Sequence, residues 1–123
     1  MRPRYAILLL LLIINRFVFS EPVNFVHYQV ENGLSNNAVL STLQDKQGFL
    51  WLGTKDGLNR FDGYSFRVFR HDPQQPGSIG SNFVPIIMED KDGLLYAGTD
   101  KGLYIYNPAT EQFRLLGHRR DAA

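Results

Sequence analysis

The polar residues best placed to bind a ligand lie in two short turns of this sequence. Thr54-Lys55-Asp56-Gly57 and Thr99-Asp100-Lys101-Gly102 each set one ammonium and one carboxylate group between two apolar runs. Sugar recognition needs polar groups that match hydroxyls, beside an aromatic platform. The residues that we predict as ligand-binding candidates are Lys55, Asp56, Asp100 and Lys101. A solvated turn is the simpler role for any single one of them.

The remaining residues show no sequence motif that is typical of a catalytic or metal-binding site. His27, His71 and His118 lack the spacing of a metal site, and no His-Glu-x-x-His occurs. Asp90 and Asp92 sit in a turn that lacks the further oxygen ligands of a calcium loop. The chain contains no cysteine, so disulfides and thiolate metal sites are excluded. We therefore predict no catalytic residue, no metal site and no cofactor.

Length and charge restrict the class of protein. The chain has 123 residues and a formal net charge of +1, so it holds at most one small domain and has no electrostatic attraction to nucleic acid. We predict no nucleic-acid partner.

The candidate turns belong to a unit that occurs twice, 45 positions apart. The shift places Asp45 on Asp90, and it places the Gly-Thr pair of Gly53 on that of Gly98. Trp51 falls on Tyr96. Glycine and aspartate are turn formers, whereas the aliphatic and aromatic residues between them favour strands. A repeat of about 40–50 residues with four strand signals is typical of β-propeller blades.

Each repeat predicts four short antiparallel strands, so the fold class is all-β with two four-stranded propeller blades. The predicted strands of the first blade are 38–44, 49–53, 58–61 and 65–69, and those of the second are 83–89, 94–98, 103–106 and 112–116. Pro85 is awkward inside a strand because it cannot donate to the ladder. The strand at 49–53 is apolar on both faces, which predicts that both are covered. We expect Trp51 to fill the space between blades rather than to act as a stacking platform.

A further strand is predicted before the first blade. Residues 24–30 show partial alternation of apolar and polar residues and resemble the fourth strand at 65–70. Such an N-terminal strand closes the ring in many propellers by joining the last blade. The complete predicted division is a signal peptide at 1–20, a closing strand and lead-in at 21–32, blade one at 33–77, blade two at 78–116 and a disordered tail at 117–123.

The first twenty residues predict export. Arg2 and Arg4 precede a nine-residue apolar run, Ala6 to Ile14, and short side chains follow before Glu21. This is typical of a secretory signal peptide cleaved after Ser20. The alternative, an uncleaved anchor, is disfavoured because nine residues are fewer than the roughly 17–25 that span a membrane. We therefore predict an exported, periplasmic protein without a membrane span apart from the signal peptide.

The repeated motif resembles that of a known family. Residues 44–54 with 57–62, and residues 89–93 with 96–99 and 102–103, are similar to the two-component regulator propeller repeat. The lead-in 31–37 behind a signal peptide resembles the start of the periplasmic sensor of Bacteroides-type hybrid two-component systems. The resemblance implies a carbohydrate sensor that responds to oligosaccharides and signals to a cytoplasmic histidine kinase, with no enzymatic activity in these residues.

Two blades are fewer than the roughly four to eight that a ring needs. If a blade face of about 400 Å² of apolar area stays uncovered, the chain loses on the order of 10 kcal/mol of hydrophobic stabilisation. We therefore expect a fragment whose partners are the remaining blades of a longer protein, a poorly stable truncation, or a chain that assembles with copies of itself. Two alternative functions stay open, a two-blade lectin-like binding protein and a propeller enzyme fragment, and fold alone does not decide between them.

Overall fold

Alternating turn formers and strand formers give eight strands in the part of the chain that the structure describes. The computed structural model describes residue 10 and residues 20–117. The predicted signal peptide, apart from Leu10 and Ser20, and residues 118–123 lie outside the described residues. The strands are β1 (Val39–Gln44), β2 (Leu50–Thr54), β3 (Gly57–Phe61), β4 (Phe66–Phe69), β5 (Ile86–Glu89), β6 (Leu95–Thr99), β7 (Gly102–Asn107) and β8 (Gln112–Gly117), preceded by a 3-10 turn, η1 (Val30–Asn32).

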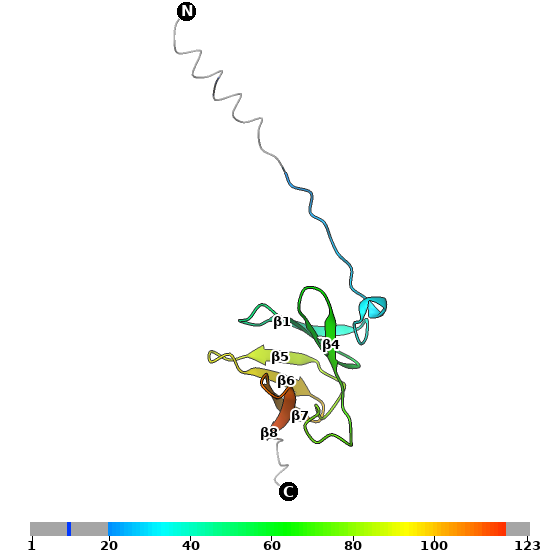
Figure 1. The fold of residues 1–123 in the computed structure, drawn as a ribbon, viewed down its shortest axis with the longest axis vertical. Coiled ribbons are helices and arrows are strands. Elements are labelled where there is room, and N and C mark those ends of the chain that lie inside the picture. The colour runs from blue at the N-terminus through cyan, green and yellow to red at the C-terminus, as the bar shows by residue number, and fades with distance from the viewer. Residues whose placement is uncertain (1–9, 11–19, 118–123) are drawn as a thin grey trace, which may run out of the picture.

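The strands form two antiparallel sheets, in the orders β1-β2-β3-β4 and β5-β6-β7-β8. The two sheets are stacked on one another (Figure 1). This confirms the predicted all-β fold with two four-stranded antiparallel blades. We call the first sheet blade 1 and the second blade 2. Among the described residues, no helix is both long enough and apolar enough to cross a membrane.

One aspartate organises the first turn of each blade. In blade 1, Asp45 Oδ1 accepts hydrogen bonds at 2.9 Å from the N–H groups of Gln47 and Phe49, and Oδ2 accepts one at 2.8 Å from Trp51 Nε1. The carboxylate therefore satisfies both the turn backbone and the only polar atom of a buried indole. This explains why the motif joins an aspartate to an aromatic residue six positions later.

The same contacts recur in blade 2. Asp90 Oδ1 accepts from the N–H groups of Asp92 and Leu94 at 2.9 Å, and Oδ2 accepts from the Tyr96 hydroxyl at 2.9 Å. The Leu94 N–H, followed by the Tyr96 hydroxyl, lowers the pKa of Asp90. Tyr96 can take the position that Trp51 has in blade 1, because its hydroxyl reaches the Oδ2 atom of the turn aspartate as the indole N–H does. The carboxylate of Asp90 is thus engaged in forming the turn.

The core lies between the two blades. Trp51 is 2 % exposed, and its ring centroid lies 4.9 Å from that of Tyr106 in β7 and 5.9 Å from that of Phe69 in β4. The prediction that Trp51 fills the space between blades is confirmed. The buried hydrophobic cluster consists of Trp51, Leu58, Phe69, Ile79, Val84, Ile87, Leu95, Ala97, Tyr106 and Phe113.

Two backbone hydrogen bonds join the start of blade 2 to the β2–β3 hairpin of blade 1. Val84 N–H donates to Thr54 O at 3.0 Å, and Gly57 N–H donates to Asn82 O at 2.6 Å. A Cβ atom at Gly53 would lie only 2.2 Å from Val84 O. The glycine of the Gly-Thr pair is therefore required for close approach of the next blade rather than for turn geometry.

A cluster of polar side chains joins the blades at their other end. Arg60 of β3 donates to the Tyr106 hydroxyl at 2.9 Å and pairs with Glu111 at 3.3 Å, and Arg67 of β4 pairs with Glu111 at 3.1 Å. Arg60 also lies over the ring of Phe49. We call these four residues (Arg60, Arg67, Tyr106 and Glu111) the rim cluster. Hydrogen bonds from Arg60, and then from Arg67, lower the pKa of Glu111.

The structure corrects three strand predictions. Residues 24–30 form no strand, since residues 20–29 are irregular and η1 begins at Val30. A strand requires a paired neighbour, and no described strand pairs with this segment. The strand predicted at 83–89 begins only at Ile86, immediately after Pro85, whose missing N–H prevents earlier pairing. Gly117, predicted as tail, is the last residue of β8.

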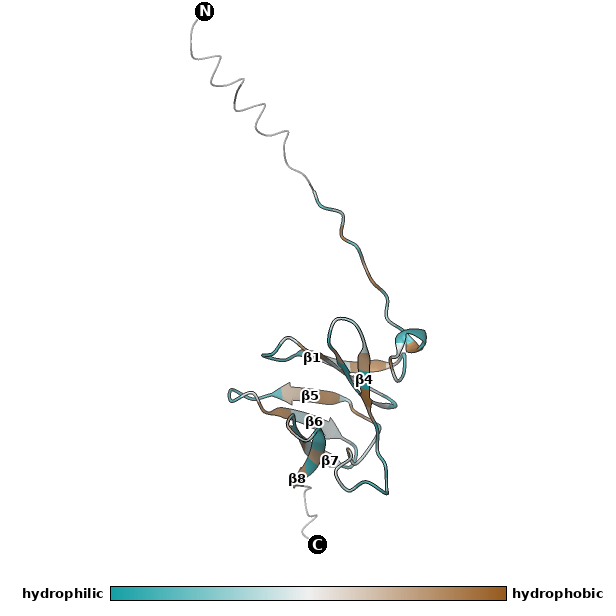
Figure 2. Cartoon of the chain, in the orientation of Figure 1, coloured by the Kyte–Doolittle hydropathy of each residue, from teal (hydrophilic) through white to brown (hydrophobic). Residues whose placement is uncertain are grey.

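Coverage of the sheets also differs from the prediction. The prediction that both faces of the strand at 49–53 are covered is wrong at Leu50, which is 36 % exposed. On the far face of blade 2, Ile86 is 54 % and Met88 is 48 % exposed. Figure 2 shows the hydrophobic colouring of β5. Each blade therefore has one face covered by the other blade, and its second face lies outward.

Candidate ligand-binding edge

One edge of the blades gathers all four predicted ligand-binding residues. The β2–β3 turn holds Lys55 and Asp56, and the β6–β7 turn holds Asp100 and Lys101. The segments that enter β1 and β5 run beside these turns, since Lys55 N–H donates to Ala38 O at 3.2 Å. We call this region the lead-in edge, and it comprises residues 35–38, 54–57, 70–71, 80–83 and 99–102.

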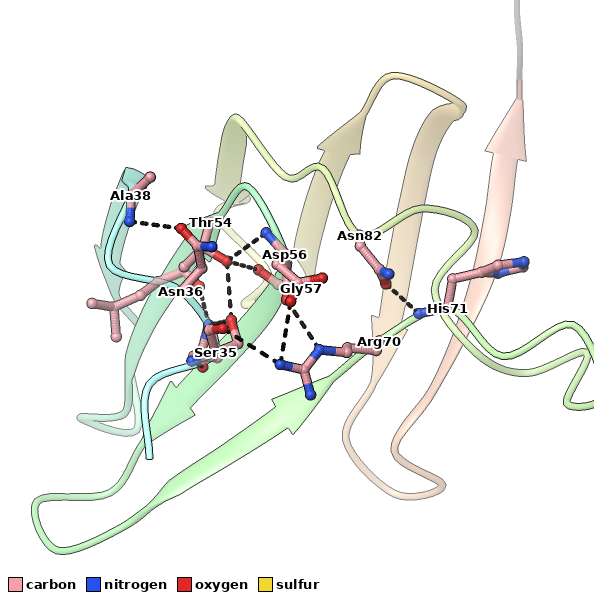
Figure 3. Close-up of polar contacts among 11 residues, drawn as sticks. Ser35, Asn36, Ala38, Thr54, Asp56, Gly57, Arg70, His71 and Asn82 are labelled. Carbon is pink, nitrogen blue, oxygen red and sulfur yellow. Dashed lines mark hydrogen bonds and ion pairs between the residues drawn. The ribbon is translucent and has the colours of Figure 1, made fainter. Parts of the chain in front are cut away.

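Asp56 forms the ionic part of the lead-in edge (Figure 3). Its Oδ2 lies 3.5 Å from Arg70 Nη2, and both side chains are about half exposed. Arg70 also donates from Nε to Asp56 O at 3.2 Å and from Nη2 to Ser35 O at 3.4 Å. Arg70 therefore connects the end of β4 to the hairpin and to the entering segment. An exposed ion pair of this kind contributes little to stability, so its groups are available to solvent and ligand.

Beneath this ion pair lies a buried network of neutral polar groups. Ser35 Oγ lies 3.0 Å from Thr54 Oγ1 and accepts from Asn59 Nδ2 at 2.8 Å, while Ser35 N–H donates to Asn59 Oδ1 at 2.9 Å. Thr54 and Asn59 are fully buried. Buried polar groups require such partners, so these residues fix the edge rather than bind a ligand.

Blade 2 presents a related arrangement with different residues. The Ser81 hydroxyl donates to the carboxylate of Asp100, and Lys101 N–H donates to Thr99 Oγ1 at 3.1 Å. Asp100 and Lys101 are both exposed. The repeat places Gly80 and Tyr104 of blade 2 where blade 1 has Ser35 and Asn59. Gly80 lies against the ring of Tyr104, and a Cβ atom at Gly80 would have no room.

The amides of the two entering segments serve the backbone. Asn36 Oδ1 accepts from Ala38 N–H at 2.8 Å, and Asn82 Oδ1 accepts from His71 N–H at 2.6 Å. Asn36 thereby forms a local turn, and Asn82 connects its segment to the residue pair after β4. The exposed charges of Lys55, Asp100 and Lys101 remain as groups that face solvent.

Two residues of the lead-in edge were missed by sequence reasoning. Arg70 follows the last residue of β4, and no spacing signal connects it to a hairpin 14 residues earlier. Phe83 is 39 % exposed and is an aromatic side chain on this edge. It lies in the segment predicted as strand, where an aromatic residue signals only β-propensity. Trp51, in contrast, hydrogen-bonds to Asp45 at the opposite edge and is buried.

No metal centre is formed by the part of the chain that the structure describes. Within residues 20–117, no three His, Asp or Glu side chains come together as potential ligands. The chemistry that the lead-in edge offers is therefore hydrogen bonding and charge, from two ammonium groups, one guanidinium and two carboxylates.

Comparison with known proteins finds a family model that matches part of blade 1. The family described as "Two component regulator propeller" matches residues 33–56. Histidine kinase P4 of Formosa agariphila is 50 % identical over 48 residues, which is 39 % of this chain and 4 % of that protein.

Two solved structures from B. thetaiotaomicron share the fold. The extracellular domain of a putative hybrid two-component system is 38 % identical with a TM-score of 0.67, and the alignment covers 73 % of this chain and 13 % of that one. The extracellular domain of a putative one-component system is 29 % identical with a TM-score of 0.61, covering 72 % and 13 %. The chain thus spans about an eighth of these domains. Its two four-stranded blades share their fold with these extracellular domains, and residues 33–56 match the two-component regulator propeller model.

Proposed function

We propose that this chain is the N-terminal part of an exported, periplasmic β-propeller sensor of a hybrid two-component system that responds to oligosaccharides. The observation that carries the proposal is the stacking of two four-stranded blades, a fold that the chain shares with the extracellular domain of a putative hybrid two-component system. Its partners are the remaining blades of a longer protein. No catalytic role is assigned to these residues, because the histidine kinase is a separate part of related proteins.

The lead-in edge supports an oligosaccharide as the ligand. Sugars are bound by polar groups that match hydroxyls, beside an exposed ring that stacks on the sugar face. The edge offers exposed charges at Lys55, Asp100 and Lys101, the half-exposed pair of Asp56 and Arg70, and the ring of Phe83. These groups come from both blades, so an elongated ligand would contact two repeats at once.

Oligosaccharide binding is tested with the purified chain on an array of plant and algal oligosaccharides. We expect bound glycans to lose affinity in Asp56→Ala, Asp100→Ala and Phe83→Ala. The matched control is Gln47→Ala, an exposed residue in the β1–β2 turn at the opposite edge. An array without binding, or equal loss in the control, would contradict the lead-in edge as the ligand site.

Export is tested separately by expressing the full chain in a Gram-negative host and sequencing the N-terminus of the periplasmic product. The proposal expects a mature chain that starts at Glu21. Retention of the first twenty residues in a cytoplasmic product would contradict the signal peptide.

A further inference from the structure

A cleft of about 800 Å³ opens between the outer strands of the two blades. It is lined by residues 67–70 at the end of β4, by the connection 71–79, and by residues 110–113 at the start of β8. We call it the junction cleft. Its volume lies within the range of about 300–1,000 Å³ in which proteins bind small molecules. Both walls belong to the described part of the chain, so the cleft is formed without any further blade.

The connection that closes the junction cleft is fixed by its own hydrogen bonds. Asp72 N–H donates to Ser78 Oγ at 3.0 Å, and Ser78 Oγ donates in turn to Asp72 O at 3.0 Å. Gln75 N–H also donates to Asp72 O at 3.0 Å, and Phe113 N–H of β8 donates to Gly77 O at 2.8 Å. A ligand would therefore meet a wall that is already ordered, and binding would lose little affinity to the ordering of the protein.

The charged groups around the junction cleft already have partners. Arg67 lies 3.1 Å from Glu111, and Arg70 lies 3.5 Å from Asp56. Asp72 Oδ1 accepts a hydrogen bond at 3.0 Å from the N–H group two residues later. A charged ligand would have to be desolvated or to break one of these pairs, and both cost free energy. The cleft therefore favours a neutral ligand.

Three glutamine side chains provide the polar groups that a neutral ligand needs. Gln74 and Gln75 belong to the connection and Gln112 belongs to β8, so the amides stand on two walls of the cleft, and all three residues are exposed. A primary amide both donates and accepts hydrogen bonds, as a sugar hydroxyl does. This set of groups matches a neutral sugar better than an ion or an apolar molecule.

Gly77 determines where the Gln112 amide lies. A Cβ atom at Gly77 would lie 2.7 Å from Gln112 Cδ, so the glutamine side chain rests directly on the backbone of the connection. Gly77 has no left-handed backbone angle, so alanine can adopt its conformation. Because Gln112 is exposed, Gly77→Ala should displace this amide and leave the buried residues beneath it in place.

We propose that the junction cleft binds neutral residues of an oligosaccharide through the amides of Gln75 and Gln112. Arg70 and His71 belong both to the cleft lining and to the lead-in edge, so the two sites adjoin at the end of β4. An oligosaccharide held at the lead-in edge would extend from there into the cleft. The inference rests on the proposed oligosaccharide ligand, but Gln75 and Gln112 lie outside the lead-in edge.

Thiol protection tests the cleft in the purified chain, which has no cysteine of its own. Gln74→Cys places a thiol in the cleft, and the control Gln47→Cys places an exposed thiol in the β1–β2 turn at the opposite edge. The rate of reaction with iodoacetamide is measured with cellotriose, mannotriose or laminaritriose, and with trigalacturonate as the charged counterpart. A neutral trisaccharide should slow the reaction at position 74 by about threefold, the factor 1 + [L]/Kd at about twice Kd, and leave position 47 unchanged.

Variants of the cleft show which groups hold the sugar. In the Gln74→Cys chain, Gly77→Ala and Gln112→Ala should each remove the protection, with an unchanged Trp51 fluorescence as the test of folding. If Gly77→Ala does not fold, Gln112→Ala alone decides. The inference is overturned when no neutral trisaccharide slows the reaction at position 74, when trigalacturonate slows it equally, or when the protection survives in the folded variants.

Lys101→Cys reports on the lead-in edge in the same experiment. Protection at position 101 without protection at position 74 would contradict the junction cleft and leave the proposed function intact. Protection at position 74 alone would support the cleft and contradict the lead-in edge as the ligand site. The two failures are therefore distinguishable.

Discussion

The two blades share their turns and strands but differ in what their aromatic motif residue touches. Trp51 faces blade 2 and is 2 % exposed, whereas its counterpart Tyr96 lies on the sheet face where Ile86 and Met88 are about half exposed. Both residues hydrogen-bond to the aspartate of their own turn. The repeat therefore specifies each blade, and the presence of a neighbour decides which of its positions becomes core.

The largest expected effect comes from truncating the two aromatic residues. Trp51→Ala should lower the free energy of unfolding by about 3–5 kcal/mol, because it empties the space between the blades. Tyr96→Ala should cost only about 1 kcal/mol, because this face has no neighbour and less area is lost. Urea unfolding followed by circular dichroism measures both. Equal losses would mean that the far face of blade 2 is already covered.

The two Gly-Thr glycines give the next comparison. Gly53→Ala should cost about 2–3 kcal/mol, because the new Cβ would meet Val84 O at 2.2 Å and push the blades apart. Gly98→Ala should cost about 1 kcal/mol or less, because the nearest atom to its new Cβ would be Ile86 Cβ at 3.2 Å. Thermal unfolding of the two variants ranks them. A larger loss at Gly98 would contradict the close blade-to-blade approach at Gly53.

The turn aspartates should behave alike in the two blades. Asp45→Ala and Asp90→Ala each leave backbone N–H groups and one aromatic donor without their acceptor, so each should cost about 1–2 kcal/mol. The same urea titration measures both, with Asp92→Ala as the control, because its side chain is exposed. A wide difference between the two would show that the repeated turn is not one structural unit.

The smallest effect concerns the rim cluster, which occurs only between the two blades. Because Arg60 and Arg67 lower the pKa of Glu111, its contribution to stability is present above the ordinary glutamate pKa and is lost as the pH falls below it. Glu111→Gln should therefore flatten the decrease in unfolding midpoint between about pH 5 and pH 3. An unchanged pH profile would mean that the ion pairs do not persist in solution.

Local sequence signals predicted most of the scaffold. Asp45 and Asp90 allow their turns to be predicted, because each carboxylate accepts hydrogen bonds from groups within six residues of it. All eight strands lie near their predicted positions. The strand predicted at 83–89 begins only at Ile86, because Pro85 has no N–H group to donate to a neighbouring strand. Residues 24–30 carry a strand pattern, yet they form no strand, because none of the described strands pairs with them.

Contacts between blades could not be predicted from the sequence. Arg60 and Glu111 are 51 residues apart, and they meet only because the blades stack with a particular rotation. The pair of Arg70 and Asp56 likewise depends on where β4 ends beside the hairpin. The four residues predicted to bind a ligand were chosen from their turn positions alone, and this explains why Arg70 and Phe83 of the same edge were not among them.

The central claim is that the far face of blade 2 is built to receive another blade. Dye binding to the purified chain tests it most directly, using 8-anilinonaphthalene-1-sulfonate and the double variant Ile86→Lys, Met88→Lys. The account predicts strong dye fluorescence that falls sharply in the variant, while the unfolding midpoint stays nearly unchanged. A folded monomer that binds no dye, or a variant that unfolds as though its core were lost, would contradict it.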